Sequence, residues 1–259
     1  MKFSSCTLVY FSPTGGTGKV GKAFASALSE KYEDYDISVC REYPERVFGE
    51  NDYVVFAVPV FAGRVLITAT ERIRRLKGNS TPCSIIAVYG NRDYDDALLE
   101  LRDTVYSLGF IPVSAGAFIA EHSMAEKIGH GRPNEEDYRE IKLFAEETLN
   151  KIASLSHSEE EELLFVKGNN PYREYPKFPT IPPASDACVK CGTCYDACPV
   201  KAIDEDDPGK TDPEKCISCM RCVKLCPTGA RALPGPVTQM IGQKLAAVAS
   251  EPKKPDFFV

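Results

Sequence analysis

The feature that most constrains this chain is a pair of cysteine runs near its C-terminal end. Each run follows the pattern C-x2-C-x2-C-x3-C-P, and together they hold eight of the eleven cysteines. Every cysteine of the first run recurs 28 positions later, so the segment is an internal duplication. The runs comprise Cys188, Cys191, Cys194 and Cys198, and then Cys216, Cys219, Cys222 and Cys226.

Three interpretations of these cysteines are possible: a structural zinc site, disulfides or iron-sulfur clusters. A structural zinc site pairs two cysteines and leaves a long gap before the second pair, whereas here a third cysteine follows after two residues, twice. Disulfides would require an exported protein, and the N-terminus is too short and too polar to be a signal peptide. A cubane cluster takes three thiolates from one tight loop and a fourth from elsewhere. The spacing therefore predicts two [4Fe-4S] clusters.

The two runs resemble bacterial two-cluster [4Fe-4S] ferredoxins over about residues 184 to 232. In that family the fourth cysteine of each run binds the other cluster. Such a module is too small to bury a core of its own, so the clusters would hold it folded. The resemblance implies one cluster on Cys188, Cys191, Cys194 and Cys226, and a second on Cys216, Cys219, Cys222 and Cys198.

Residues 1 to 154 alternate between apolar strands and amphipathic helices, which predicts an α/β fold with a parallel sheet. A doubly wound sheet of this kind binds ligands at the carboxyl ends of its strands. The loops at that edge are therefore where the chemistry is expected. The predicted strands are Thr7 to Phe11, Tyr35 to Val39, Asp52 to Val58, Ser84 to Tyr89 and Phe110 to Ile119.

The first loop at this edge, residues 12 to 19, follows a strand and opens a helix. Its backbone N–H groups and the positive helix end would attract an anion. As a P-loop it fails, because Pro13 stands at the first glycine and Val20 at the hydroxyl position. A dinucleotide pattern, G-x-G-x-x-G, runs from Gly16 to Gly21, but it is weak on its own.

A third pattern in this loop, [ST]-x-T-G-x-T, resembles the FMN phosphate loop of flavodoxins. Its glycines would let the backbone close on a phosphate, and its hydroxyls would add donors. A structural glycine-rich turn or a bare anion site remains the alternative. The resemblance implies that the phosphate is held by Ser12, Thr14, Gly15, Gly16, Thr17 and Gly18.

Two more loops, residues 59 to 64 and 89 to 95, follow the third and fourth strands. In flavodoxin-like proteins these loops sandwich the isoalloxazine ring. Aromatic side chains stack well on a flat conjugated face, so Phe61 and Tyr94 are the candidate stacking partners, with a packing role as the alternative for each. The implied ring-binding residues are Pro59, Phe61, Gly63, Gly90, Asn91, Asp93 and Tyr94.

Three other segments carry weaker signals. Residues 155 to 183 are predicted to be a stiff connector, because five prolines alternate there with three aromatic residues. The segment from Gly116 to Gly131 reads as a loop, in which His122 and His130 are more simply solvated or capping residues than proton carriers. An apolar stripe from Val237 to Val248 predicts a helix, and we expect this extension to pack across one of the domains.

Charge and hydropathy limit the partners. The net charge of −6 argues against nucleic acid, whose binding rests on basic patches. No apolar run approaches the length of a membrane span. An acidic cluster-bearing module predicts a redox partner with a positive docking face. With no targeting signal and with oxygen-sensitive clusters, we expect a cytoplasmic protein.

The whole chain resembles bacterial and archaeal proteins in which a flavodoxin-like domain precedes a two-cluster ferredoxin domain. The predicted division is a flavodoxin-like FMN-binding domain at 1 to 154, a Pro-rich linker at 155 to 183, an α+β ferredoxin-like domain at 184 to 232, and a C-terminal helix and tail at 233 to 259.

The leading hypothesis is an electron-transfer protein. Clusters pass one electron at a time and FMN holds one or two, so the chain would move single electrons between two [4Fe-4S] clusters, FMN and an external partner. It further predicts that one cluster lies close to the flavin. The alternatives are an FMN-dependent reductase of a small molecule or quinone, and a ferredoxin whose flavodoxin-like domain lacks flavin and serves for docking.

Overall fold

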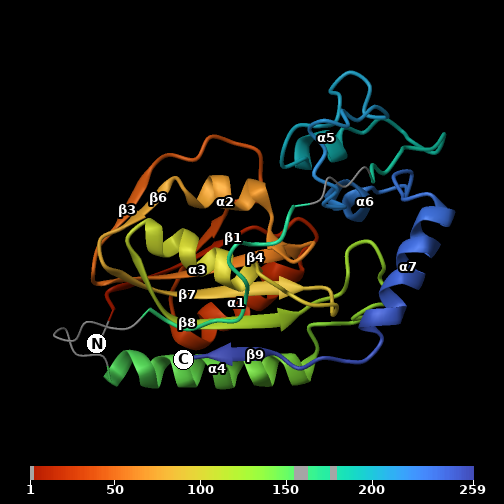
Figure 1. Ribbon diagram of the computed structural model, residues 1–259. Helices are drawn as coiled ribbons and strands as arrows, with labels where there is room; N and C mark the ends of the chain where they lie inside the picture. The colour runs from red at the N-terminus through yellow and green to blue at the C-terminus, as the bar shows by residue number, and fades with distance from the viewer. Residues whose placement is uncertain (1–2, 155–162, 176–179) are drawn as a thin grey trace.

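The computed structural model describes residues 3–154, 163–175 and 180–259. Parts of the predicted linker, residues 155–162 and 176–179, lie outside the described residues. Figure 1 shows a layered α/β part and, above one end of its sheet, a small module that carries the short helices α5 (Thr193–Ala197) and α6 (Arg221–Leu225).

A parallel sheet forms the centre of the larger part. Its strands lie side by side in the order β2-β1-β4-β7-β8 and all pair in parallel. This is the flavodoxin-like order, in which the chain moves from the first strand to both sides. The predicted five-stranded doubly wound sheet is therefore confirmed. The strands are β1 (Ser5–Tyr10), β2 (Glu33–Asp36), β4 (Asp52–Phe61), β7 (Thr81–Tyr89) and β8 (Phe110–Ile119).

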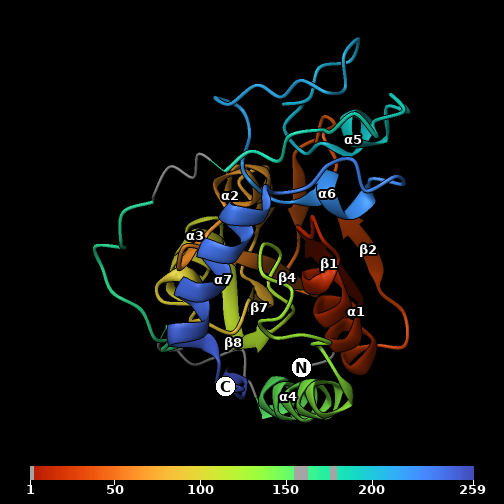
Figure 2. The ribbon, with the colours of Figure 1, turned by 90° about the vertical axis from the view of Figure 1, so that its right-hand side faces the viewer.

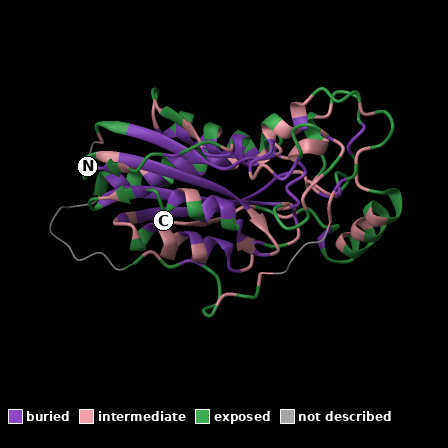
Figure 3. Cartoon of the chain, turned by 90° about the horizontal axis from the view of Figure 1, so that it is seen from above, coloured by how far each residue is buried: buried purple, intermediate pink, exposed green. Residues whose placement is uncertain are grey.

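Helices cover both faces of this sheet. One buried apolar cluster joins the sheet to α2 (Ile67–Ile73) and α3 (Ala97–Ser107), and a second joins it to α1 (Gly16–Leu28) and α4 (Glu135–Ser154). Every residue of β7 is buried, as a strand covered on both faces requires. Figure 3 shows the buried residues concentrated in these strands.

The helix ends follow local signals in the sequence. After α3 the chain turns at Gly109, whose φ of +86° is a left-handed conformation that suits glycine. At the start of α4, Asn134 Oδ1 accepts hydrogen bonds from the N–H groups of Glu136 at 3.0 Å and Asp137 at 3.1 Å.

Several short strands were not predicted. The strand β3 (Arg46–Phe48) pairs in parallel with β6 (Leu76–Gly78), and β5 (Arg64–Val65) pairs antiparallel with β4. Two or three residues are too few to show a periodic pattern.

The C-terminal extension crosses from the module to the sheet. Its helix α7 (Gly235–Ala249) stands at the end of the sheet to which the strand arrows point (Figure 1). The tail then forms β9 (Asp256–Phe258), which pairs antiparallel with β8 as an edge strand. The predicted packing of this extension across a domain thus takes the form of an added strand.

The cysteine-rich module has little regular structure. Besides α5 and α6, its described residues form only isolated bridges, Ala184 with Arg231 and Ile203 with Thr211. The predicted α+β character is present only in this reduced form. Among the described residues, no helix combines the length and the hydropathy that crossing a bilayer requires.

Candidate functional site

A cavity of about 500 Å³ lies at the carboxyl ends of the strands, where ligands were expected. Its walls come from the three predicted loops, from the segment after β8 and from α7, which passes in front of this edge in Figure 2. Of the predicted flavin-binding residues, it brings together Thr14, Gly16, Thr17, Pro59, Phe61, Gly63, Gly90 and Asp93.

The first loop is shaped by hydrogen bonds at its base. The Ser12 hydroxyl accepts the N–H of Gly18 at 2.9 Å, and the Ser12 N–H donates to Ser38 Oγ at 2.7 Å. Neither Ser12 nor Gly18 lines the cavity, so their role in this structure is to fix the loop. Gly15 caps α1 with a φ of +96°, and a Cβ added there would meet no atom within 4 Å. The first turn of α1 and this open backbone fit a phosphate group.

The second and third loops line the cavity with Gly63 and Gly90 and with two aromatic residues, Phe61 and Tyr89. Phe61 is half-buried at the wall, which leaves its predicted stacking role open. A Cβ at Gly90 would lie 2.4 Å from the His122 ring, so only glycine permits this close approach. Aromatic side chains beside glycine backbone are a lining that suits an isoalloxazine ring.

Tyr94 and Asn91 do not line the cavity. Tyr94 is only 4% exposed, its ring lies 5.6 Å from that of Tyr89, and its hydroxyl donates to Asp256 Oδ2 at 2.7 Å. The predicted stacking role is therefore corrected for Tyr94, which is a packing residue that anchors the tail. Asn91 is also buried, and its amide donates to the carbonyls of Ala249 at 2.7 Å and Glu251 at 3.0 Å. The strand β9, which contains Asp256, was not predicted, and the role of Tyr94 was missed for that reason. The partners of Asn91 lie at the end of α7 and just after it, more than 150 positions away in the sequence.

His122 lines the cavity, although the sequence favoured an ordinary solvated or capping role. Its Nδ1 accepts the N–H of Met124 at 3.2 Å. Burial lowers the pKa of His122 to about 4, and the nearby charge of Arg92 acts in the same direction. A neutral imidazole whose Nδ1 is an acceptor carries its proton on Nε2, so this ring is a hydrogen-bond donor at neutral pH.

Two arginines also reach the cavity and were not predicted. Arg92 pairs with Asp95, and Arg173 pairs with the same carboxylate at 2.5 Å. Arg173 belongs to the predicted linker, whose composition gives no sign of a site. On the other side, Ile241 and Leu245 of α7 close the cavity with apolar side chains.

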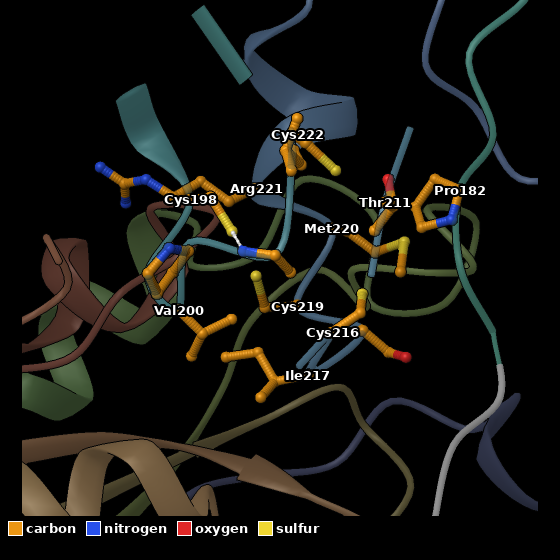
Figure 4. Close-up of a pocket in the computed structure, with 14 residues that line it drawn as sticks. Pro182, Cys198, Val200, Thr211, Cys216, Ile217, Cys219, Met220, Arg221 and Cys222 are labelled. Carbon is orange, nitrogen blue, oxygen red and sulfur yellow. Dashed lines mark hydrogen bonds between the residues drawn. The ribbon is translucent and has the colours of Figure 1, made fainter. Parts of the chain in front are cut away.

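A second, smaller cavity lies inside the cysteine-rich module. Four cysteines line it, and they are the mixed set that the resemblance implies for one cluster: Cys198 from the first run with Cys216, Cys219 and Cys222 from the second. Figure 4 shows their sulfur atoms around the same space. The Ala202 N–H donates to Cys198 Sγ at 3.3 Å, the kind of bond that supports a ligating thiolate.

The other predicted set lies nearer the surface. Cys191 is exposed, and its sulfur lies 3.4 Å from the Thr193 hydroxyl. Burial raises the pKa of Cys226, but backbone hydrogen bonds at Arg231 and contacts with Thr228 outweigh it, so the pKa lies below its usual value. None of the eleven cysteines, all of which lie in the described ranges, forms a disulfide. In the described ranges, no three His, Cys, Asp or Glu side chains converge as a site for a single metal ion.

Arg231 shows that the module is suited to an anionic group. Its side chain is 2% exposed, and within the described ranges its Nη atoms donate only to neutral acceptors, including the Pro182 carbonyl at 2.9 Å and the Thr211 hydroxyl at 2.8 Å. Its Nε has no partner in the described part of the chain. A buried charge without a counter-charge is costly. Since a [4Fe-4S] core with four thiolates is anionic, the donor set and this cation together fit such clusters.

The module contacts the α/β part through the second run and through the residue that follows the first. Arg72 donates to the Pro199 carbonyl, and Lys224 pairs with Glu121 at 3.8 Å and Glu126 at 3.7 Å. Arg221 Nη1 donates to the carbonyl of Ser12, in the predicted phosphate loop, at 3.2 Å. Two residues that line the four-cysteine cavity, Pro199 and Arg221, therefore contact the α/β part directly.

The cysteine-rich module is similar to known iron-sulfur proteins. The family of 4Fe-4S dicluster domains matches residues 187–230. The chain is 36% identical over 72 residues to pyruvate synthase subunit PorD of Methanocaldococcus jannaschii, covering 26% of this chain and 84% of that protein. It is 37% identical over 59 residues to a ferredoxin of Pyrobaculum islandicum, covering 22% of this chain and 55% of that protein. A component of the Na(+)-translocating ferredoxin:NAD(+) oxidoreductase complex of Acetobacterium woodii is 48% identical over 48 residues, which cover 18% of this chain and 14% of that protein.

Among solved structures, flavodoxins resemble the larger part. A Streptococcus pneumoniae TIGR4 flavodoxin aligns with 57% of this chain and 99% of its own, at 18% identity and a TM-score of 0.41. An archaeal flavodoxin aligns with 57% of this chain and 99% of its own, at 13% identity and a TM-score of 0.37. At these scores the fold assignment rests on the strand order and not on the likeness.

Proposed function

Because this chain belongs through its C-terminal module to the 4Fe-4S dicluster family and joins that module to a flavodoxin-like domain, we propose that it passes single electrons between two [4Fe-4S] clusters, FMN and an external redox partner. Clusters supply one-electron steps, and a flavin supplies either one or two.

The observation that carries this proposal is a contact between residues that line the two cavities, the hydrogen bond from Arg221 Nη1 to the Pro13 carbonyl. Four cysteines of the predicted crossover set line one, and Arg221, which lies between two of them in the sequence, reaches the loop that would hold the flavin phosphate. Covalent tethering and docking favour rapid transfer, because the two sites cannot diffuse apart.

Named side chains would hold each group. The cluster nearer the flavin would be bound by Cys216, Cys219, Cys222 and Cys198, and the farther one by Cys188, Cys191, Cys194 and Cys226. The flavin phosphate would lie on residues 14 to 17 and the ring between the loops of Phe61 and Gly90. His122 would donate a hydrogen bond from Nε2 at the ring's side of the cavity, and α7 would exclude water there.

The external partner would meet the exposed side of the module. Asp204, Glu205 and Asp206 are all exposed, and Tyr195 donates to Glu205 at 2.9 Å. This acidic turn supports a partner with a positive docking face, since charge complementarity speeds encounter.

The test is a cofactor count on anaerobically purified protein. We expect about eight iron and eight sulfide ions and about one FMN per chain. Colourless protein, or zinc in place of iron and sulfide, would contradict the proposal. Eight iron ions per chain without flavin would instead support the alternative hypothesis, a ferredoxin whose flavodoxin-like domain lacks flavin and serves for docking.

A second function, reduction of a small molecule or quinone by FMN, is supported by the size and lining of the larger cavity. Beside the flavin loops it includes Lys244, whose charge would attract an anionic acceptor, and the neutral imidazole of His122, which would donate a hydrogen bond to one. Here the reduced protein would be mixed anaerobically with quinones and other small acceptors. Saturable reoxidation by one of them would favour this function, and reoxidation only by a redox protein would favour the first.

A further inference from the structure

Arg221 links the two candidate cofactor sites through one side chain. It lies between Cys219 and Cys222 in the sequence and begins α6. Its Nη1 donates to the Ser12 carbonyl at 3.2 Å and to the Pro13 carbonyl at 3.3 Å. In Figure 4 its guanidinium points away from the sulfur atoms that surround the smaller cavity. The cysteine loop thus extends a cation to the start of the predicted phosphate loop.

The charge of Arg221 is not matched by a carboxylate. The ion pairs of the described residues do not include it, whereas Lys224, one turn later, pairs with Glu121 and Glu126. Its Nε is buried and has no hydrogen-bond partner among the described residues. An unpaired, partly buried cation beside a helix N-terminus increases the attraction of that site for an anion.

The same region has a groove that continues the phosphate loop. It is lined by Thr14, Gly16 and Lys19 of the loop, by Met220 and Lys224 of the module, and by Glu121 and Glu126, with which Lys224 pairs. Basic side chains from both parts of the chain therefore lie around the place where the α1 N-terminus opens, and the two glutamates balance the charge of Lys224. The phosphate end of a flavin would lie nearer to the module than its ring would.

We propose that Arg221 is a specificity-determining residue that makes the larger site select phosphorylated flavin over riboflavin. This inference rests on the proposed function. The guanidinium positions the loop through the carbonyls of Ser12 and Pro13 and adds positive potential on the phosphate side. A phosphate dianion responds to that charge, whereas the neutral ribityl hydroxyl of riboflavin does not.

The experiment compares two ligands on one protein. Full-length protein with its clusters loaded and its flavin removed is dialysed to equilibrium against FMN or riboflavin. For Arg221→Met we expect FMN binding to weaken about tenfold and riboflavin binding less than about twofold. Arg221→Lys keeps the charge and restores much of the preference. The matched control is Arg72→Met, which removes another hydrogen bond between the two parts and should leave the FMN-to-riboflavin ratio unchanged.

Equal weakening of both ligands by Arg221→Met would overturn the inference, because it would reduce Arg221 to a structural contact. Should that variant lose iron, Arg221→Lys and Arg221→Gln carry the test, and equal ligand ratios for these two would overturn it as well. Wild-type protein that binds neither ligand would instead contradict the proposed function. Iron content is measured on every variant.

Discussion

The two parts of this molecule are held together by different means. The α/β part has two apolar clusters that enclose its sheet, with side chains such as Phe56, Phe110 and Phe144 at 0% exposed. The module's own cluster consists of two cysteines, Ala202 and Ile203. Apolar burial stabilises a fold in proportion to its area, so the first part can fold by burial alone and the second cannot. This difference predicts which part will lose stability when iron is removed and which when a core side chain is truncated. It also predicts that the loss of a buried charge will change the reduction potential of a cluster.

The largest expected difference between the two parts follows from the removal of iron. With a chelator and a reductant, we expect residues 184 to 232 to lose amide protection while the sheet keeps it, because metal ligation contributes on the order of 10 kcal/mol to small metal-dependent folds. Hydrogen exchange of apo and loaded protein would measure this. If the module kept its amide protection without iron, it would not depend on clusters for its fold, and the proposed difference between the two parts would be wrong.

A core truncation would act on the other part. Phe144 is fully buried and stacks on Phe24 at 4.7 Å and on Phe257 at 5.0 Å. Phe144→Ala should lower the free energy of unfolding by about 3–5 kcal/mol, since a cavity remains. The matched control is Leu143→Ala, because that neighbour is 50% exposed and should change it by less than about 0.5 kcal/mol. Chemical denaturation provides the values, and equal losses for the two variants would contradict the prediction.

Removal of the buried charge of Arg231 would test whether this residue affects the reduction potential of a cluster. We expect Arg231→Met to lower the reduction potential of a cluster by about 60 mV, a tenfold change in the one-electron equilibrium, because the anionic reduced form loses its buried cation. Lys215→Met removes an equal charge at an exposed position, where its pair with Asp212 is solvated, and should change the potential much less. Redox titration followed by electron paramagnetic resonance would measure both. Equal shifts would refute a special role for Arg231.

The smallest expected effect is a pH dependence at the boundary between the two parts. Burial holds the pKa of His122 near 4, below the ordinary 6.5. The unfolded chain therefore binds a proton that the folded chain does not, and stability falls as the pH falls from about 6.5 towards 4. Between pH 7.5 and 5.5, we expect the wild-type melting temperature to fall about 2–4 °C more than that of His122→Gln.

His130→Gln is the control for this pH effect, because the His130 side chain is 79% exposed. It should melt in parallel with the wild type over the same pH range. A His122→Gln variant with the same pH slope as the wild type would show that another group causes the loss.

Local sequence signals were reliable where a short stretch decides its own structure. The buried run of β4 and the caps at Gly109 and Asn134 could be read directly, because strand burial and helix capping depend on a few neighbouring residues. Tyr94 was misread as a stacking partner for the opposite reason. Its hydroxyl partner, Asp256, lies 162 positions away on a strand of three residues that no pattern marks.

The sequence by itself determined the cysteine ligand chemistry, the parallel sheet and the edge at which the loops gather, since spacing and periodicity are written in consecutive residues. The tertiary structure alone decided that Arg221 reaches the loop of residues 12 to 19, that His122 faces the larger cavity and that Arg231 is buried with no carboxylate partner among the described residues. Each of these arrangements depends on contacts between segments that are far apart in the sequence. Such contacts form only when the chain folds, so no local pattern of residues predicts them.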